Sequence, residues 1–375
     1  MSIYQIIAKP IAELREYLTK YGAELRSTKF PDTYLIKFSP HTQSTDPAIN
    51  RLRGVIFNAK TLKVYSLGYP VPMEFKDQDK ACQDSTLQTI KGQPYLVQEA
   101  LDGTLIRLWF HEESGKWMLS TNSKEDANDA YWMNDLSFGE LFESTLQTIL
   151  NGLNPDHVYL FSLCHPLNVI VVNHVQPHIY HVTTYDRVSL EEVVDDLGLE
   201  RPPIHQISVD EVLERVKSSK GTPVASAGYV IVQSIEGEDE TVVHRYRFEN
   251  ANYTSARVLR GDSNKIESIL LTHMMNSPEQ LEEFLLYYPI YVPTYNLLIE
   301  RYNALAWMLY QTYSQRYQQH RYILVHPRHH RFLLEMHTEL YMTHLKPRGA
   351  TVQAQDVLNY LYNQSPETVL SLLDA

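Results

Sequence analysis

The residues of this 375-residue chain with the clearest chemical potential are Asp102 and Gly103, inside the segment 95–108, YLVQEALDGTLIRL. Apolar residues lead into this pair and follow it. The pattern therefore predicts a strand, a short turn, and a second strand that begins at Thr104. A carboxylate beside a glycine, between two buried strands, can hold a polar ligand. An ordinary Asp-Gly hairpin has the same residue types, and the segment alone favours that interpretation.

Helices are predicted at several places before residue 262. Near the N-terminus, Ile11, Leu14 and Leu18 recur at helical spacing after Pro10. The other helical segments are 126–150 and, as surface helices of an insertion, 190–197 and 209–216.

Strands are predicted where β-branched and aromatic residues concentrate. The polar segment 39–50 is predicted to be a loop, the acidic segment 236–240 a turn, and 58–61 the turn of a hairpin. The predicted strands are 33–38, 52–57, 63–67, 70–75, 116–123, 158–172, 179–185, 229–233 and 242–248.

Beyond about residue 262 the strand patterns stop, and Leu, Tyr and Gln dominate helical patterns. We therefore predict a mixed domain over 1–261 and a helical domain over 262–375. The helices predicted in the second domain are 280–288, 295–317, 330–345 and 351–373.

The helical domain holds a cluster of basic and aromatic residues between Arg316 and Arg348, with Tyr322 and Phe332 interleaved. Such a set suits a nucleic-acid surface, and a solvated helix face is the equally good alternative. The histidines at 326–330 lack a matching set of companion ligands, so no metal site is predicted. The candidate RNA contacts are Arg321, Arg328, Arg331 and Lys346.

Bulk composition limits the class of protein. The net charge is −12 and the isoelectric point about 5.7, so nucleic-acid binding requires a local basic patch. The two cysteines, Cys82 and Cys164, argue against a disulfide scaffold and fit a reducing interior. Neither a signal peptide nor a membrane-spanning run is predicted. We expect an intracellular protein with no membrane partner.

The motifs of this chain, in the order in which they occur, resemble those of the covalent nucleotidyltransferases, in particular those of the phage RNA ligase 1 family of ATP-dependent tRNA-repair enzymes. Their nucleotidyl-transfer motif runs Lys-x-Asp-Gly-Ser/Thr, and Asp102, Gly103 and Thr104 match its end. Arg53 matches an Arg-Gly-Ile/Val-x-Phe strand, and 158–172 matches Phe-Glu-x-x-x-Pro-x-Asn-x-Ile-Val. The resemblance implies an α+β fold: antiparallel nucleotidyltransferase (ATP-grasp-like ligase) sheets with flanking helices, plus an all-helical C-terminal domain.

The catalytic positions of that family are replaced in this chain. Ala100 occupies the position of the attacking lysine and has no nucleophile, so the covalent step cannot occur there. Two acidic positions, the first a metal and ribose contact, hold Ser162 and Ala227, and the closing Lys-x-Lys motif is Arg245 to Arg247. Arginine keeps the charge but does not replace a lysine near a reacting phosphate. Several independent losses favour inherited inactivity over one engineered substitution.

Three hypotheses follow. The first is a pseudo-ligase without cofactor, an RNA-binding or structural module, with Arg53, Arg245 and Arg247 as the remaining anion-binding set. The second is an active RNA ligase that uses ATP and Mg²⁺, its nucleophile substituted at Ala100 or supplied from another position, such as Lys91 or Lys124. The third is a structural subunit of a virion or another assembly, with the Tyr-rich helices as its interface. RNA, including tRNA, a protein partner and an association with a virus or phage are implied accordingly.

Overall fold

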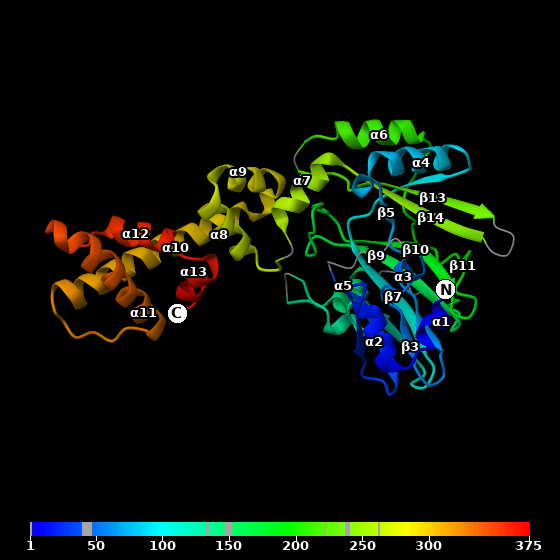
Figure 1. Ribbon diagram of the computed structural model, residues 1–375, viewed down its shortest axis with the longest axis horizontal. Coiled ribbons are helices and arrows are strands. Elements are labelled where there is room, and N and C mark those ends of the chain that lie inside the picture. Colours follow the sequence, from blue (N-terminus) through cyan, green and yellow to red (C-terminus); the bar gives the residue numbers. More distant parts are fainter. Residues whose placement is uncertain are drawn as a thin grey trace. The chain divides into compact units, whose positions relative to one another are not determined.

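The computed structural model describes the chain except residues 1, 40–46, 133–134, 147–151, 222, 237–240 and 262 (Figure 1). Two compact units are present, Met1–Ser255 and Ala256–Ala375. The first contains three β-sheets with flanking helices, and the described part of the second is helical. The predicted class, an α+β protein with antiparallel sheets and a helical C-terminal region, is confirmed.

The first sheet lies in the N-terminal part of the chain and is a four-stranded antiparallel meander. Two short helices precede it, and Ile6, Leu14 and Leu18 of these helices are buried in its core. Ser2 starts the first helix with a capping box, which satisfies backbone donors at its N-terminus. The elements are α1 (Ile3–Ile7), α2 (Ile11–Thr19), β1 (Ala23–Ser27), β2 (Thr33–Phe38), α3 (Pro47–Asn50), β3 (Ile56–Asn58) and β4 (Val64–Ser66).

The second sheet has the strand order β11-β10-β9-β7-β8 and is antiparallel. The helix α5 (Phe138–Thr145) buries Leu141 and Phe142 in the same core cluster as Tyr159 and Phe161 of the central strand. The strands are β7 (Thr104–His111), β8 (Lys116–Ser120), β9 (His157–Cys164), β10 (His178–Asp186) and β11 (Glu192–Val193).

The third sheet has the order β12-β6-β13-β14-β5, with one parallel pair at its β5 edge. Two amphipathic helices pack beside each other on this sheet (Figure 1), and they bury Ile90, Val209 and Val212 against Ile231 and Tyr246. The elements are β5 (Met73–Glu74), α4 (Lys80–Lys91), β6 (Leu96–Glu99), β12 (Ile204–His205), α6 (Val209–Ser218), β13 (Gly228–Glu236) and β14 (Thr241–Glu249).

The segment 95–108 forms the two predicted strands but not the ordinary hairpin. β6 pairs with β13 in the third sheet, and β7 pairs with β9 in the second. The chain passes from one sheet to the other through residues 100–103. The Asp-Gly hairpin interpretation is wrong, and the turn lies at the junction of two sheets.

The described part of the second unit consists of helices that bury apolar side chains, among them Phe284, Leu309, Leu333, Met336 and Leu361. Two stretches have π-helical hydrogen bonding. The elements are α7 (Ala251–Arg260), which crosses the boundary between the units, α8 (Ile266–Asn276), α9 (Pro278–Tyr287), α10 (Val292–Tyr313), the π-helix η4 (Ser314–Gln318), α11 (Pro327–Met336), the π-helix η5 (His337–Leu345), α12 (Ala354–Tyr362) and α13 (Pro366–Leu373).

Several predicted elements differ from the structure. The segment 190–197 is not helical: Glu192 and Val193 form the short strand β11, which pairs with the end of β10, and the rest is irregular. The strand expected over 158–172 ends at Cys164, and the residues that follow are turns and bends. The single helix expected over 351–373 is two helices, since Ser365 and Pro366 start a new one.

Parts of three other predictions lie outside the described residues. Of the loop expected over 39–50, the end is the short helix α3, and 40–46 are not described. Of the helix expected over 126–150, only 138–145 is α-helical among the described residues. Most of the acidic turn at 236–240 is not described. No helix of the described chain combines the length and the apolar character that crossing a bilayer demands.

Candidate functional site

A cavity of about 270 Å³ lies at the sheet-to-sheet crossing between β6 and β7. Ala100, Leu101 and Asp102 line it from this crossing, and the segment 225–227 before β13 lines another side. The end of β9, the bends after it and the start of β10 complete the lining through Cys164, Val172, His174, Val175, Gln176, His178 and Tyr180, together with Glu99.

Asp102 is held rigidly at this cavity. It is 5% exposed. Its Oδ2 accepts hydrogen bonds from the backbone N–H groups of Val171 and Val172 at 2.8 and 2.7 Å, and its Oδ1 accepts one from the Tyr253 hydroxyl at 2.8 Å. Both carboxylate oxygens therefore have fixed partners. The carboxylate ties the bends after β9 and the first turn of α7 to the crossing.

Gly103 is required by a close approach of two backbones. A Cβ atom there would lie 2.6 Å from Ser162 Oγ and 2.8 Å from the Leu163 carbonyl oxygen. Beside it, the Thr104 hydroxyl accepts a hydrogen bond of 2.8 Å from the buried amide of Asn168. The structure thus brings together Asp102, Gly103, Thr104 and Ser162, which the sequence had placed in one site.

The two replaced positions Ala100 and Ala227 line the same cavity. Ala100 donates its backbone N–H to the carbonyl of Gly228 at 2.9 Å, which holds the end of β6 beside the start of β13. Both alanines are buried, at 5% and 0% exposure. Their methyl groups contribute neither a nucleophile nor a charge. Leu101 lines this cavity, whereas Phe75 stacks on Phe248 in the core of the third sheet.

The ionisable groups of the cavity are carboxylates, imidazoles, a thiol and a phenol. Among the described residues that line it there is no lysine or arginine. His174 lies 2.6 Å from the Asp102 carbonyl oxygen, and Glu99 lies 3.6 Å from His205. Burial raises the pKa of the Cys164 thiol to about 12, so this sulfur is protonated at neutral pH and a poor nucleophile.

A nucleoside triphosphate with Mg²⁺ does not fit this set of donors. Mg²⁺ prefers an octahedron of hard oxygen ligands, and the two positions that would supply carboxylates are Ser162 and Ala227. The oxygens of Asp102 already accept three hydrogen bonds. A triphosphate also needs cationic donors, which the described lining lacks. We therefore derive no step through ATP or a metal ion.

Arg53 lies next to a buried arginine that the sequence analysis missed. Arg107 on β7 is 0% exposed and donates to the carbonyls of Gly54 and Thr121. Burial, with the positive charge of Arg53 nearby, lowers the pKa of Arg107 to about 9. The signal available in the sequence was one charged residue inside the apolar strand LIRLWF. Its contacts with two carbonyls connect the first sheet to the second.

Arg245 and Arg247 on β14 are engaged by carboxylates. Arg245 forms an ion pair with Glu192 and donates to the Tyr69 hydroxyl at 3.0 Å. Arg247 lies 3.3 Å from the fully buried carboxylate of Glu249, which also binds Lys76. A phosphate at either guanidinium would have to compete with these carboxylates.

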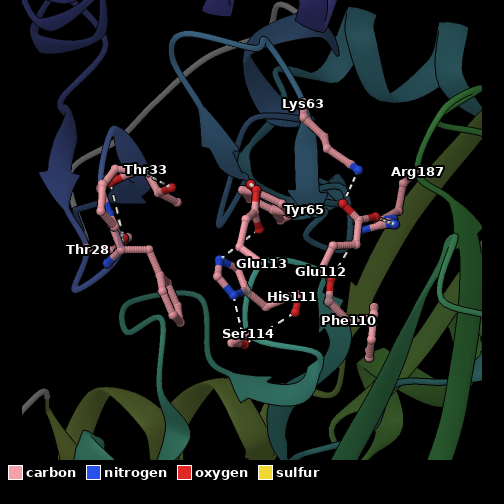
Figure 2. Close-up of polar contacts among 12 residues, drawn as sticks. Thr28, Thr33, Lys63, Tyr65, Phe110, His111, Glu112, Glu113, Ser114 and Arg187 are labelled. Atoms are coloured by element: carbon pink, nitrogen blue, oxygen red, sulfur yellow. Dashed lines mark hydrogen bonds and ion pairs between the residues drawn. The ribbon is translucent and has the colours of Figure 1, made fainter.

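A separate polar network at the end of β7 lies outside the cavity (Figure 2). His111 contacts Ser114 Oγ at 2.9 Å through Nδ1 and Glu113 at 3.2 Å through Nε2, and Tyr65 donates to Glu113. Figure 2 also shows Glu112 between Lys63 and Arg187, with which it forms ion pairs. The side chains of this network bind one another across the first and second sheets, so we assign it a structural role.

The basic candidates of the helical unit are exposed, with individual differences. Arg331 pairs with Glu335 at 2.9 Å, and Arg328 donates to the Ser371 carbonyl at 3.0 Å. Tyr322 is 92% exposed, whereas Phe332 is buried in the core and cannot contact a ligand. Arg321 and Lys346 are also exposed. Between residues 316 and 348 the sequence has six Lys or Arg and two Glu, a local excess of positive charge.

Comparisons with known proteins give distant similarities. No family model matches the chain. An immediate-early protein ICP-46 homolog of Invertebrate iridescent virus 3 is 20% identical over 292 residues, which are 74% of this chain and 62% of that protein. The chain thus spans less than two thirds of that relative's length.

The solved structures with similarity include two ligases. A candidate ATP-dependent DNA ligase from Aquifex aeolicus is 13% identical, with 88% of each chain covered and a TM-score of 0.43. An archaeal ATP-dependent RNA ligase is 13% identical, with 81% of each chain covered and a TM-score of 0.44. Similarity at this level assigns no activity to the present chain.

Proposed function

We propose that this protein is an RNA-ligase-like pseudoenzyme that binds RNA and does not form a covalent nucleotide intermediate. One observation carries the proposal: Ala100 and Ala227, the positions of a nucleophile and a carboxylate in the family it resembles, line one cavity whose described lining has no lysine or arginine. An amine is needed to attack the α-phosphate, and a cation is needed to neutralise the phosphate charge.

Two lysines were candidates for a relocated nucleophile. Lys91, at the end of α4, pairs with Asp210 at 2.8 Å, and Lys124 is exposed in the turn after β8. Neither lines the cavity. These placements favour the inactive interpretation over an active ligase with a relocated nucleophile.

The helical unit supports RNA as the ligand. The chain as a whole carries a net charge of −12, yet the segment 316–348 has the local excess of Lys and Arg described above. Phosphate contacts by such residues supply most of the sequence-independent affinity for nucleic acid. We propose that this segment holds the RNA contacts, and that the protein acts in a virus, as the similarity to a viral immediate-early protein suggests.

Intact-mass spectrometry after incubation with Mg²⁺ and ATP, with GTP in parallel, tests the loss of chemistry. We expect an unchanged mass, while an active covalent nucleotidyltransferase treated alongside gains one nucleotide monophosphate. A nucleotide adduct on this protein would overturn the proposal. The Ala100→Lys variant, treated in the same way, shows whether the missing amine is the only defect. We expect no adduct there either, because Ser162 and Ala227 leave the metal without its carboxylates.

Fluorescence anisotropy with labelled RNA tests the binding function separately. We expect saturable binding that weakens as salt is raised. A chain that binds no RNA, but co-purifies with a protein partner or forms a large stable oligomer, would instead support a structural subunit of an assembly.

A further inference from the structure

Four aromatic rings form a continuous ladder in the helical unit, contributed by two segments far apart in the sequence. Tyr313 stacks on Tyr317 with ring centroids 4.8 Å apart, Tyr317 on His337 at 4.3 Å, and His337 on Tyr341 at 5.0 Å. The three interplanar angles lie between 20° and 25°. Tyr313 is buried, while the other three rings are partly exposed. Among the described residues no further ring stacks on Tyr341.

The backbone that carries the ladder is unusual. Tyr317 lies in the π-helix η4, and both His337 and Tyr341 lie in the π-helix η5. π-Helical turns account for well under 1% of residues in globular proteins and frequently occur at functional sites. Here two π-helical segments contact each other through their aromatic side chains. This backbone geometry is an observation independent of the ring stacking.

The ladder is uncharged at neutral pH and has cations beside it. The Tyr313 hydroxyl and His337 Nδ1 share a hydrogen bond of 2.8 Å. Burial and the nearby Lys346 lower the pKa of His337. The Arg316 guanidinium lies 6.0 Å from the Tyr317 ring and 2.9 Å from His330.

The two carboxylates of this segment are already paired with other groups. Glu335 binds Arg331 at 2.9 Å, and Glu339 accepts a hydrogen bond of 2.6 Å from the Tyr360 hydroxyl. They neutralise neither Arg316 nor Lys346 directly. Among the described residues neither Arg316 nor Lys346 forms an ion pair. A neutral aromatic surface flanked by such cations is complementary to a nucleotide, whose base is a neutral ring and whose phosphate is an anion.

We propose that the ring ladder of Tyr313, Tyr317, His337 and Tyr341 is a stacking platform for an unpaired nucleotide of a single-stranded RNA. The base stacks on Tyr341 at the end of the ladder, and Lys346 and Arg316 contact the flanking phosphates. The proposal deepens the proposed function and rests on RNA binding by the helical unit. A duplex is excluded as the preferred ligand, since its bases already stack on each other.

The test measures binding of the full chain to a labelled single strand of about 12 nucleotides, a length within the range of known single-strand sites. Tyr341→Leu removes the aromatic face and keeps an apolar side chain. We expect affinity to fall roughly five- to hundredfold, as for the loss of one stacked base. Tyr341→Phe keeps the ring and should bind within twofold of the wild type. Tyr131→Leu is the matched control, because this exposed tyrosine lies in the first unit, outside both the ladder and the segment 316–348.

A second readout separates stacking from a general loss of structure. A 2-aminopurine base in the strand should be quenched by the wild type and by Tyr341→Phe but not by Tyr341→Leu, while circular dichroism of the three proteins coincides. The slope of affinity against salt should not change in Tyr341→Leu, because no charge is removed.

The outcomes distinguish the two proposals. Wild-type binding that Tyr341→Leu leaves unchanged, or a preference for duplex over single strand, would overturn the stacking platform and leave RNA binding intact. The absence of any RNA binding would overturn the proposed function itself. A single-stranded DNA of the same sequence shows whether the ribose 2′-hydroxyl is also read; equal binding of both supports stacking alone as the recognition.

Discussion

The cavity at the β6–β7 crossing and the ring ladder of the helical unit differ in charge and in how their polar atoms are used. Asp102 at the crossing is bonded to other parts of the fold, and so are Arg245 and Arg247 on β14, which do not line the cavity. In the helical unit, the cations Arg321 and Lys346 are exposed. The comparison indicates that the polar groups of the first region are used by the fold itself, whereas the cations of the second are accessible to a ligand.

Among the substitutions that distinguish the two regions, Asp102→Ala is expected to have the largest effect, a loss of stability of the first unit. The change leaves two buried backbone N–H groups and the Tyr253 hydroxyl without their acceptor, and each buried unsatisfied group costs about 1–3 kcal/mol. We expect the first unit to lose about 3–9 kcal/mol of unfolding free energy. Urea unfolding followed by tryptophan fluorescence in a Trp307→Phe background reports on this unit, because the three other tryptophans lie in it.

Asp79→Ala is the matched control for that experiment. Asp79 caps α4 by accepting the Cys82 N–H at 2.8 Å and is solvent-exposed, so about 1 kcal/mol is expected. Equal losses for the two variants would show that Asp102 is not a structural anchor of the crossing, and its carboxylate would then be available for a ligand.

The next largest effect is expected at acidic pH, where protonation of His181 should lower the unfolding free energy of the first unit. This imidazole is 1% exposed, and burial lowers its pKa to about 4. Because the unfolded state binds the proton more tightly, with a pKa near 6.5, stability is lost as pH falls from about 6.5 to 4. The loss due to this group is about 3 kcal/mol at pH 4 relative to pH 7.

We expect His181→Gln to flatten that acid dependence while lowering stability at pH 7, since glutamine does not titrate there. Unfolding free energies measured by urea at pH 7 and pH 4 check this result. His244→Gln, at a partly exposed position in the same unit, should leave the difference between the two pH values unchanged. An unaltered pH dependence in His181→Gln would show that His181 is not held neutral by burial.

A smaller effect is expected for the cations of the helical unit. Replacement of Arg321, Arg328 and Lys346 together by alanine should weaken RNA binding at least tenfold, or about 1.4 kcal/mol, at low salt. The slope of log affinity against log salt should fall by roughly 2, because each phosphate contact to a single strand contributes about 0.7. The control replaces three exposed lysines of the first unit, Lys116, Lys124 and Lys220, and should leave the slope unchanged.

The smallest effect is expected from Arg245→Ala combined with Arg247→Ala. Since carboxylates already engage both guanidinium groups, RNA affinity should stay within about twofold of the wild type. Anisotropy titrations at two salt concentrations check this. A tenfold loss would return these arginines, together with Arg53, to the anion-binding role that the family resemblance implies, and would place RNA contacts in the first unit.

Much of the fold could be predicted from local sequence. The strands 33–38 and 116–120, the helix after Pro10 and the helix 209–216 follow from periodicity and capping residues, which act over a few positions. The conformation of the segment 190–197 could not be predicted, because its mixed apolar and acidic residues suit a helix as well as an edge strand. Pairing with β10 decided the outcome.

The residue types of the candidate site could be predicted from the sequence, but the contacts and hydrogen bonds of these residues could not. The sequence by itself determined that position 100 has no amine, that 227 has no carboxylate and that positive charge concentrates between 316 and 348, because side-chain chemistry is a property of each residue. Only the tertiary structure decided that β6 and β7 enter different sheets and that Asp102 is bound by groups some 70 and 150 positions away. It also brought the tyrosines of η4 and η5 into one ladder. Such contacts depend on which apolar faces pack together, and the spacing of residues along the chain does not record that choice.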